Sequence, residues 1–147
     1  MRAVVQRVAS ACVAADEGRY SPIGPGMVVL LGIAPGDTDK ESAWMSRKLA
    51  SLRIFADSEG KMNLSLRDTG GEALVVSQFT LYGDASRGNR PGFSASARFE
   101  DARPVYERFV RMLQEALLRP VATGWYGADM QLSLVNDGPV TLIVDTP

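Results

Sequence analysis

The sequence of 147 residues contains no histidine. Histidine is the side chain that most readily exchanges protons near neutral pH, so its absence excludes a Ser-His-Asp triad, a Cys-His pair and any imidazole metal ligand. An enzyme with this sequence must move protons with carboxylates, lysine, tyrosine, ordered water or a group of its own substrate. The lysines (Lys40, Lys48 and Lys61) lie in no segment typical of a pocket, which disfavours Schiff-base chemistry.

The sequence also has little cysteine and a small net charge. The single cysteine, Cys12, cannot form an internal disulfide or a multi-thiolate zinc site, and it is best interpreted as a small strand residue. A formal net charge of −1 disfavours a protein held to nucleic acid by overall attraction. Residues 84–111 are locally rich in arginine, and a segment of this kind is ordinarily a solvated loop and helix face. No apolar run reaches the length of a membrane span and the N-terminus does not resemble a leader, so we expect a cytoplasmic protein without a membrane partner.

The hydrophobic content of 46% is sufficient for one core, and we predict a single domain over residues 1–147. Apolar runs bounded by turn residues predict strands at residues 3–8, 10–15, 27–34, 53–55, 73–79, 130–135 and 140–144. Apolar residues at helical spacing predict one helix from Asp39 and another from about Asp101 to the Arg119-Pro120 boundary. Residues 58–71 and 84–97 show no period and are predicted to be surface loops. This order predicts an α+β domain with two main helices and a curved, mostly antiparallel, barrel-like sheet.

The segment SQFTLYG, residues 77–83, has polar side chains at the end of an apolar strand. In one interpretation, Ser77, Gln78 and Thr80 only satisfy a neighbouring loop. In the other, these groups and the adjacent backbone N–H groups face a substrate carbonyl as an oxyanion site. Thr80 has no histidine or N-terminal amine to activate it as a nucleophile, so we assign it a supporting role.

The segment NDGPVT, residues 136–141, joins two apolar strands through Asp-Gly, which by itself predicts a hairpin turn. The proline directly after the turn glycine fits that interpretation poorly, because it cannot join a strand ladder. A cis Gly138-Pro139 bond would turn both carbonyls in one direction, where they could accept hydrogen bonds from an amino group. Both interpretations remain open from the sequence.

Together, SQFT and NDGPVT resemble the two signature motifs of the D-aminoacyl-tRNA deacylases, also called the D-tyrosyl-tRNA(Tyr) deacylase family. The segments MRAVVQRV, RIF, GKMNLS, RGNRPGFS and ADMQLSLVNDGPVT also resemble the family pattern, so the similarity extends over nearly the whole chain. The residues after the first motif, Tyr82 and Gly83, and those before the second helix, residues 98–100, are less typical. These departures concern the surface that would face tRNA more than the chemistry.

The resemblance implies a homodimeric editing hydrolase that removes D-amino acids from tRNA without metal or cofactor and has no DNA partner. The 2′-hydroxyl of the terminal adenosine would assist the reaction. A Gly-cisPro element from one subunit would enter the other subunit's site and exclude L-amino acids, while glycyl-tRNA would be cleaved. The family pattern assigns catalytic positions to Ser77, Gln78, Phe79 and Thr80, substrate-binding positions to Met130, Asn136, Gly138 and Pro139, and a bracing role to Arg7.

Three alternatives remain open from the sequence: a non-catalytic tRNA-binding or dimerisation module of the same fold, an unrelated small-molecule hydrolase, and a purely structural dimer. Intact SQFT and Gly138-Pro139 favour the D-specific enzyme.

Overall fold

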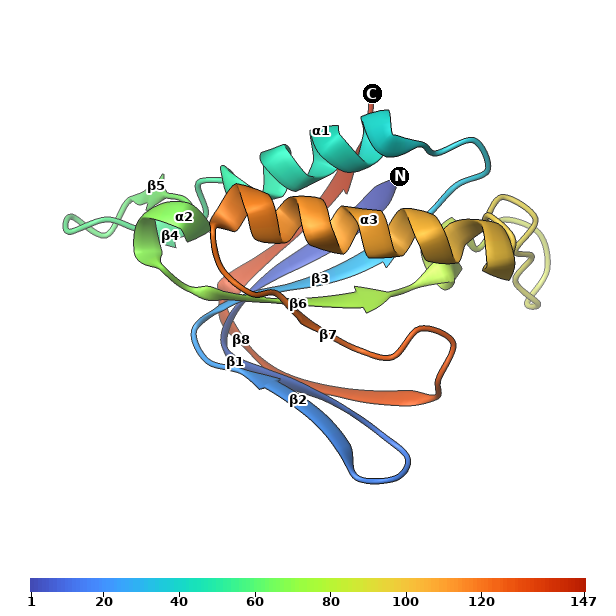
Figure 1. Cartoon of the computed structure of the whole chain (residues 1–147), viewed down its shortest axis with the longest axis horizontal. Helices are drawn as coiled ribbons and strands as arrows, with labels where there is room; N and C mark the ends of the chain where they lie inside the picture. The colour runs from blue at the N-terminus through green and yellow to red at the C-terminus, as the bar shows by residue number, and fades with distance from the viewer.

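The computed structural model describes all 147 residues, which form a six-stranded sheet, a two-stranded ribbon and a layer of helices (Figure 1). The elements are β1 (Arg2–Ala15), β2 (Arg19–Ile23), β3 (Gly26–Gly32), α1 (Asp39–Ala50), β4 (Phe55–Ala56), β5 (Met62–Leu64), α2 (Leu66–Thr69), β6 (Glu72–Ser77), the 3₁₀ turn η1 (Phe79–Tyr82), α3 (Phe99–Leu117), β7 (Ala122–Thr123) and β8 (Met130–Asp145). No helix is both long enough and apolar enough to cross a membrane.

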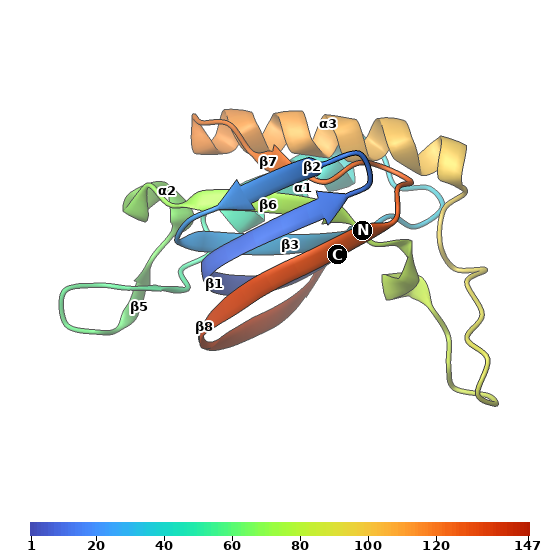
Figure 2. The same ribbon diagram turned by 90° about the horizontal axis from the view of Figure 1, so that it is seen from below.

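The main sheet is mixed and strongly curved. Strand β1 pairs antiparallel with β2, β3 and β8, whereas β3 with β6 and β6 with β7 are parallel. The first half of β1 pairs with β3 and its second half with β2, while β8 follows both halves. Strands β1 and β8 therefore bend together and curl the sheet into a partly closed barrel (Figures 1 and 2). This confirms the predicted α+β class with two main helices and a curved, mostly antiparallel sheet.

Two pairs of predicted strands are single strands in the structure. Residues 3–8 and 10–15 are parts of β1, with register shifts between Gln6 and Ser10. Residues 130–135 and 140–144 both belong to β8, and both halves run antiparallel to β1. A hairpin would reverse the chain at Asp137-Gly138, so that interpretation is wrong. The chain makes a local excursion there and continues along β1.

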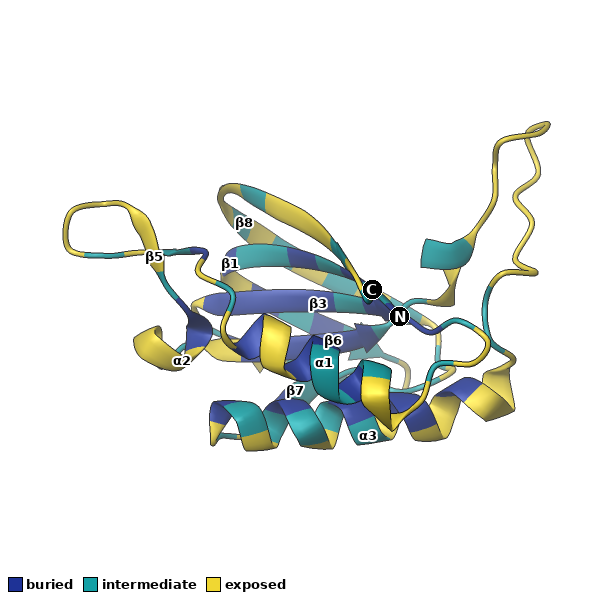
Figure 3. Ribbon diagram, turned by 90° about the horizontal axis from the view of Figure 1, so that it is seen from above, coloured by how far each residue is buried: buried dark blue, intermediate teal, exposed yellow.

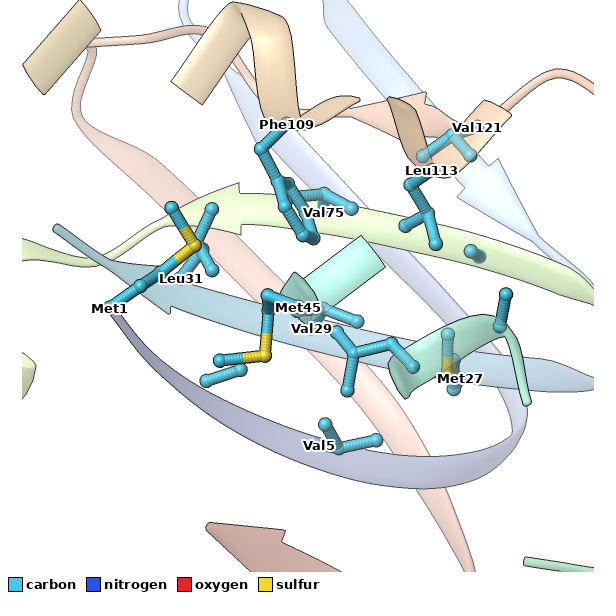
Figure 4. Packing of buried hydrophobic residues seen from close by; sticks show 14 of the residues in the cluster. Met1, Val5, Met27, Val29, Leu31, Met45, Val75, Phe109, Leu113 and Val121 are labelled. Atoms are coloured by element: carbon cyan, nitrogen blue, oxygen red, sulfur yellow. The ribbon is translucent and has the colours of Figure 1, made fainter. Parts of the chain in front are cut away.

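The core has two parts, separated by the central strands. Alternate residues of β3, namely Met27, Val29 and Leu31, belong to a cluster of 21 buried residues between the sheet and the helices. Val28, between them, belongs to a second cluster of seven buried residues on the other face of the sheet. The central strand is thus buried on both faces, as its unbroken apolar run predicts. Figure 3 shows this burial along β3 and β6, and Figure 4 shows Phe109 of α3 above Val75 of β6.

The two long helices contribute apolar stripes to the larger cluster. In α1, Thr38 and Glu41 form a capping box, and Met45 and Leu49 are fully buried. Helix α3 buries the predicted stripe, which includes Phe109 and Leu113. It begins at Phe99, slightly before the predicted start.

The two-stranded ribbon β4–β5 and helix α2 occupy a region that was predicted to be mostly irregular. Helix α2 has a capping box at Ser65 and one fully buried anchor, Leu66. An element with a single apolar anchor has no period to detect, so the pattern could not predict it. The strand predicted for residues 73–79 ends at Ser77, because the chain turns into η1 at Phe79.

Candidate active site

A cavity of about 850 Å³ lies where the end of β6 meets the first turn of α3 and the start of β8. It is large enough for one small ligand. Among the predicted site residues, Ser77, Gln78, Phe79 and Met130 line it. The other lining residues are Leu31, Ile33, Val76, Phe93, Ser94, Ser96, Ala97, Arg98, Phe99, Ala102, Tyr126, Gly127, Ala128, Asp129 and Leu132.

The backbone at the end of β6 leaves two donors free beside this cavity. The N–H of Gln78 donates to the carbonyl oxygen of Leu31 at 2.8 Å, which is the last bond between this chain segment and β3. The next residues, Phe79 and Thr80, begin the 3₁₀ turn, where N–H groups have no partner within the helix. Neither N–H donates a hydrogen bond within the chain. This pair of free N–H groups can stabilise negative charge on a substrate oxygen.

Thr80 is exposed and does not line the cavity. Its hydroxyl oxygen accepts a hydrogen bond from the side-chain amide of Gln78. The amide is a donor and cannot take the proton of the hydroxyl, and the hydroxyl forms no hydrogen bond with a carboxylate or any other base. The geometry therefore offers no means of activating Thr80 as a nucleophile.

The rest of the cavity wall includes residues that the sequence did not point to. The rings of Phe99 and Tyr126 lie 4.9 Å apart between centroids, and the Tyr126 hydroxyl donates to the Phe99 carbonyl oxygen at 3.1 Å. Burial raises the pKa of Tyr126, so it stays protonated at neutral pH and is not a base. Arg98 and Asp129 are the ionisable residues of opposite charge in the wall. They are 31 positions apart in the sequence, and only the tertiary fold brings them into the same cavity wall.

The excursion in β8 is held in place by Asn136 and Arg7. The Asn136 side chain bonds to both the N–H and the carbonyl of Val140, at 3.2 and 3.1 Å, and thereby closes residues 136–140 into a small loop. Arg7 donates from Nε to the carbonyl oxygen of Asp137 at 2.8 Å and from Nη1 to that of Ile54 at 2.6 Å. Its Nε also lies 3.2 Å from the Asp137 carboxylate. We refer to residues 136–140 as the β8 loop.

The tip of the β8 loop consists of Gly138 and Pro139, which are exposed and joined by a cis peptide bond. A Cβ on Gly138 would lie 2.5 Å from the backbone nitrogen of Val140 and 3.3 Å from Nη2 of Arg7. Only glycine fits at this position without moving the backbone.

The β8 loop and the cavity are separate within one chain. None of Arg7, Asn136, Gly138 and Pro139 lines the cavity. In Figures 1 and 2 the bend of β8 lies at the opposite end of the sheet from η1, which borders the cavity. The predicted site residues therefore form two groups, and a single chain does not bring them together. No group of three or more His, Cys, Asp or Glu side chains is positioned to hold a metal ion.

Residues 4–145 match the family model described as D-Tyr-tRNA(Tyr) deacylase. The chain belongs to this family, as the SQFT and NDGPVT motifs predicted. A relative named D-aminoacyl-tRNA deacylase from Chlorobium limicola is 67% identical over 147 residues, which cover 100% of this chain and 98% of that protein. A relative of the same name from Myxococcus xanthus is 54% identical over 147 residues, which cover 100% of this chain and 95% of that protein.

Two solved structures are similar in fold. One, described as c-Myc DNA unwinding element binding protein, superposes with a TM-score of 0.93 at 43% identity, over 100% of this chain and 99% of that one. The other, described as a probable eukaryotic D-amino acid tRNA deacylase, has a TM-score of 0.84 at 19% identity, over 99% and 98%. The second similarity is evidence of the common fold alone.

Proposed function

We propose that this protein hydrolyses the ester that joins a D-amino acid to the terminal adenosine of tRNA. Water adds to the ester carbonyl, the acyl–oxygen bond breaks, and free D-amino acid and tRNA with a regenerated hydroxyl are released. Family membership and the names of the relatives support this substrate. The observation that carries the proposal is the pair of free N–H groups on Phe79, which lines the cavity together with Ser77, and on Thr80, the next residue in the chain. The proposal implies a cytoplasmic enzyme, because its substrate is a component of translation.

The free N–H groups would bind the carbonyl oxygen as it acquires negative charge. One such donor lowers a barrier by roughly 3 kcal/mol. An aminoacyl ester is already an activated acyl group, so positioning and polarisation are a large part of what it needs. Ser77 and the Gln78 backbone would align the ester, while Met130, another residue of the cavity wall, would contact the adenosine.

In this proposal the 2′-hydroxyl of the terminal adenosine assists the reaction without a metal ion: it takes the proton that the attacking water loses and passes its own proton to the leaving 3′-oxygen. The chain has no histidine, Tyr126 has a raised pKa, and the Thr80 hydroxyl accepts from Gln78. Asp129 is the carboxylate in the cavity wall and hence the rival base. We expect Asp129→Asn to keep most of the wild-type turnover, measured by single-turnover deacylation. A loss of 10²-fold or more in folded protein, the size typical of a removed base, would make Asp129 the base instead.

We further propose that the site is completed by a second copy of the chain. The β8 loop is exposed, braced and far from the cavity of its own subunit, as expected of an element that serves a neighbour. Strand β8 pairs only with β1, so its outer edge has unpaired backbone groups. The large apolar side chains of Val135, Leu142 and Ile143 are exposed on the same strand. An isologous contact along β8 would cover this surface and let each subunit donate its loop.

The β8 loop would also be the source of chiral selectivity. If the Gly138 and Pro139 carbonyls accept from the substrate amino group while η1 binds the ester carbonyl, only one direction from the α-carbon remains open. A D side chain can point there, whereas an L side chain would meet the loop backbone. This steric exclusion needs no pocket for a particular side chain, so diverse D-amino acids and glycine should be accepted.

The test is deacylation of D-aspartyl-, glycyl- and L-aspartyl-tRNA at equal enzyme concentration. We expect cleavage of the first two and none of the third. Binding of tRNA without any turnover would favour the non-catalytic module, and resistance of the glycyl ester alone would refute steric exclusion. Sedimentation at the assay concentration tests the second-copy proposal, which a fully active monomer would contradict.

A further inference from the structure

The chain between η1 and α3 is a projecting loop with a concentration of positive charge. Residues 84–98, here called the arginine loop, contain Arg87, Arg90 and Arg98 but only one acidic residue, Asp84. None of the three arginines forms an ion pair. The Asp84 carboxylate accepts from the Ser86 N–H at 2.9 Å and so caps the loop. In a protein of net charge −1, this is a local cationic surface.

The arginine loop is anchored at the rim of the cavity. Asp84 and Gly92 exchange two backbone hydrogen bonds of 2.8 Å, which close the projecting part at its base. Below this closure, the ring of Phe93 lies edge-on to that of Phe79, 5.3 Å between centroids. The Ala97 N–H donates to the Ile33 carbonyl oxygen at 2.9 Å. The C-terminal part of the loop, from Phe93 to Arg98, therefore contributes to the cavity wall, and Figure 3 shows the exposed tip of the loop extending away from the body.

The cavity and the loop together indicate where the remainder of a large substrate lies. A volume of about 850 Å³ suits a single aminoacylated nucleotide, so the preceding nucleotides must lie outside. Phe93 and Arg98 of the arginine loop line the cavity, so nucleotides that leave the cavity on this side would run along the loop. Arginine binds phosphate oxygens with paired N–H groups, and an unpaired exposed arginine has these donors available.

We infer that the arginine loop binds the RNA phosphate backbone that precedes the terminal nucleotide, through Arg87 and Arg90. This inference rests on the proposed function, because it takes the occupant of the cavity to be the aminoacylated end of tRNA. The loop contributes affinity for the RNA, whereas the cavity performs the chemistry. Binding of this kind does not depend on base sequence, since phosphates are common to all nucleotides.

The test compares wild type with Arg87→Gln/Arg90→Gln on two substrates, D-aspartyl-tRNA and a D-aspartyl ester of adenosine alone. On tRNA we expect KM to rise on the order of tenfold with kcat unchanged. On the adenosine ester, which has no phosphates for the loop to bind, both constants should stay at their wild-type values. Loss of two phosphate contacts to single-stranded RNA should also reduce the salt dependence of tRNA binding, by about 1.4 in the slope of log K against log salt.

Two further variants control for charge. Arg47→Gln/Arg67→Gln removes the same charge from exposed positions on α1 and α2, and it should leave KM for tRNA and the salt slope near wild type. Arg87→Lys/Arg90→Lys retains the charge and should restore most of the affinity. Thermal unfolding of every variant verifies that the fold is intact.

The inference is overturned if the Arg87/Arg90 double variant keeps the wild-type KM and salt slope, or if the Arg47/Arg67 control shifts both equally. Binding of tRNA that carries no amino acid, measured separately by fluorescence anisotropy, distinguishes failure of this inference from failure of the proposed function. If wild type cleaves no D-aminoacyl-tRNA, the proposed function fails, while the anisotropy comparison still tests the arginine loop.

Discussion

Replacing Arg7 with alanine tests whether the β8 loop is a positioned element of the site. Arg7 connects this loop to the body of the protein through the carbonyl oxygens of Asp137 and Ile54 and through the Asp137 carboxylate. Its side chain is only 14% exposed, so water replaces these contacts poorly when the guanidinium is removed. We expect Arg7→Ala to loosen the loop without disturbing the cavity, which it does not line.

The expected loss of stability follows from these contacts. Each hydrogen bond from a charged donor contributes about 1.5–3 kcal/mol. The ion pair adds less than about 1 kcal/mol, because the Asp137 side chain is 58% exposed. These contributions are reduced by partial exposure and by the side-chain entropy that alanine does not lose. The expected loss of unfolding free energy in Arg7→Ala is therefore on the order of 3 kcal/mol. For a chain of this length, that lowers the melting temperature by about 6–12 °C.

The assay combines calorimetry at one fixed protein concentration with single-turnover deacylation well below the melting temperature. A fixed concentration is required because dimerisation couples stability to concentration. If the loop contributes to the partner's site, kcat/KM for D-aspartyl-tRNA should fall on the order of 100-fold, as expected for a misplaced positioning element.

A matched control is Arg53→Ala. Arg53 also braces a loop, through two bonds of 2.7 Å to Asn63 of β5, but it is exposed and lies just before β4. This variant should lose less than about 1 kcal/mol of stability and keep full activity. An Arg7→Ala protein as active and selective as Arg53→Ala would refute the positioning argument.

Three other predictions concern chemistry, packing and pH. Thr80→Ala should retain kcat within roughly a factor of three in the deacylation assay, and an acyl-enzyme trapped on Thr80 would contradict this. Tyr106→Phe should lower the free energy of unfolding in urea by about 1 kcal/mol, because it removes the hydrogen bond from the buried hydroxyl to the Val75 carbonyl. The loss is small because that carbonyl still accepts from the Gly124 N–H, and an unchanged urea midpoint would contradict the contribution of the bond. The Thr38 and Ser65 hydroxyls hold the pKa values of Glu41 and Asp68 below their ordinary 4.5 and 3.8. The two carboxylates therefore stabilise the fold fully above their ordinary pKa values, and this stabilisation is lost as the pH falls through the lower pKa values of the folded protein. We expect the urea midpoint to drop in that acid range, and to drop less steeply in Glu41→Gln.

Much of the fold could be predicted from local patterns. The stripe of α3, including Phe109 and Leu113, was predicted because every member faces the sheet at helical spacing. The apolar run at residues 27–34 was predicted as a strand, and the structure has β3 there, buried on both faces. Short elements such as α2, with Leu66 as its one anchor, were missed because the pattern is too short to show a period.

The candidate site depends more on tertiary structure. The SQFT and NDGPVT motifs predicted the family from sequence alone, and that prediction is confirmed. The roles of the individual site residues stay predictions. The sequence did not reveal that Arg98 and Asp129 share a wall with Ser77, because residues far apart in the sequence are brought together only by the tertiary fold.

What the sequence determined by itself is therefore the class of fold, the main helices and the family. Whether Asp137-Gly138 reverses the chain or interrupts a strand was decided by tertiary structure, because both halves of β8 find their hydrogen-bond partners on β1. Pairing with a distant strand is a non-local interaction, and the residues of a turn motif do not indicate it. The separation of the β8 loop from the cavity has the same origin. The bend of β8 and the turn η1 lie at opposite ends of the curved sheet, so one chain does not bring its two motifs together.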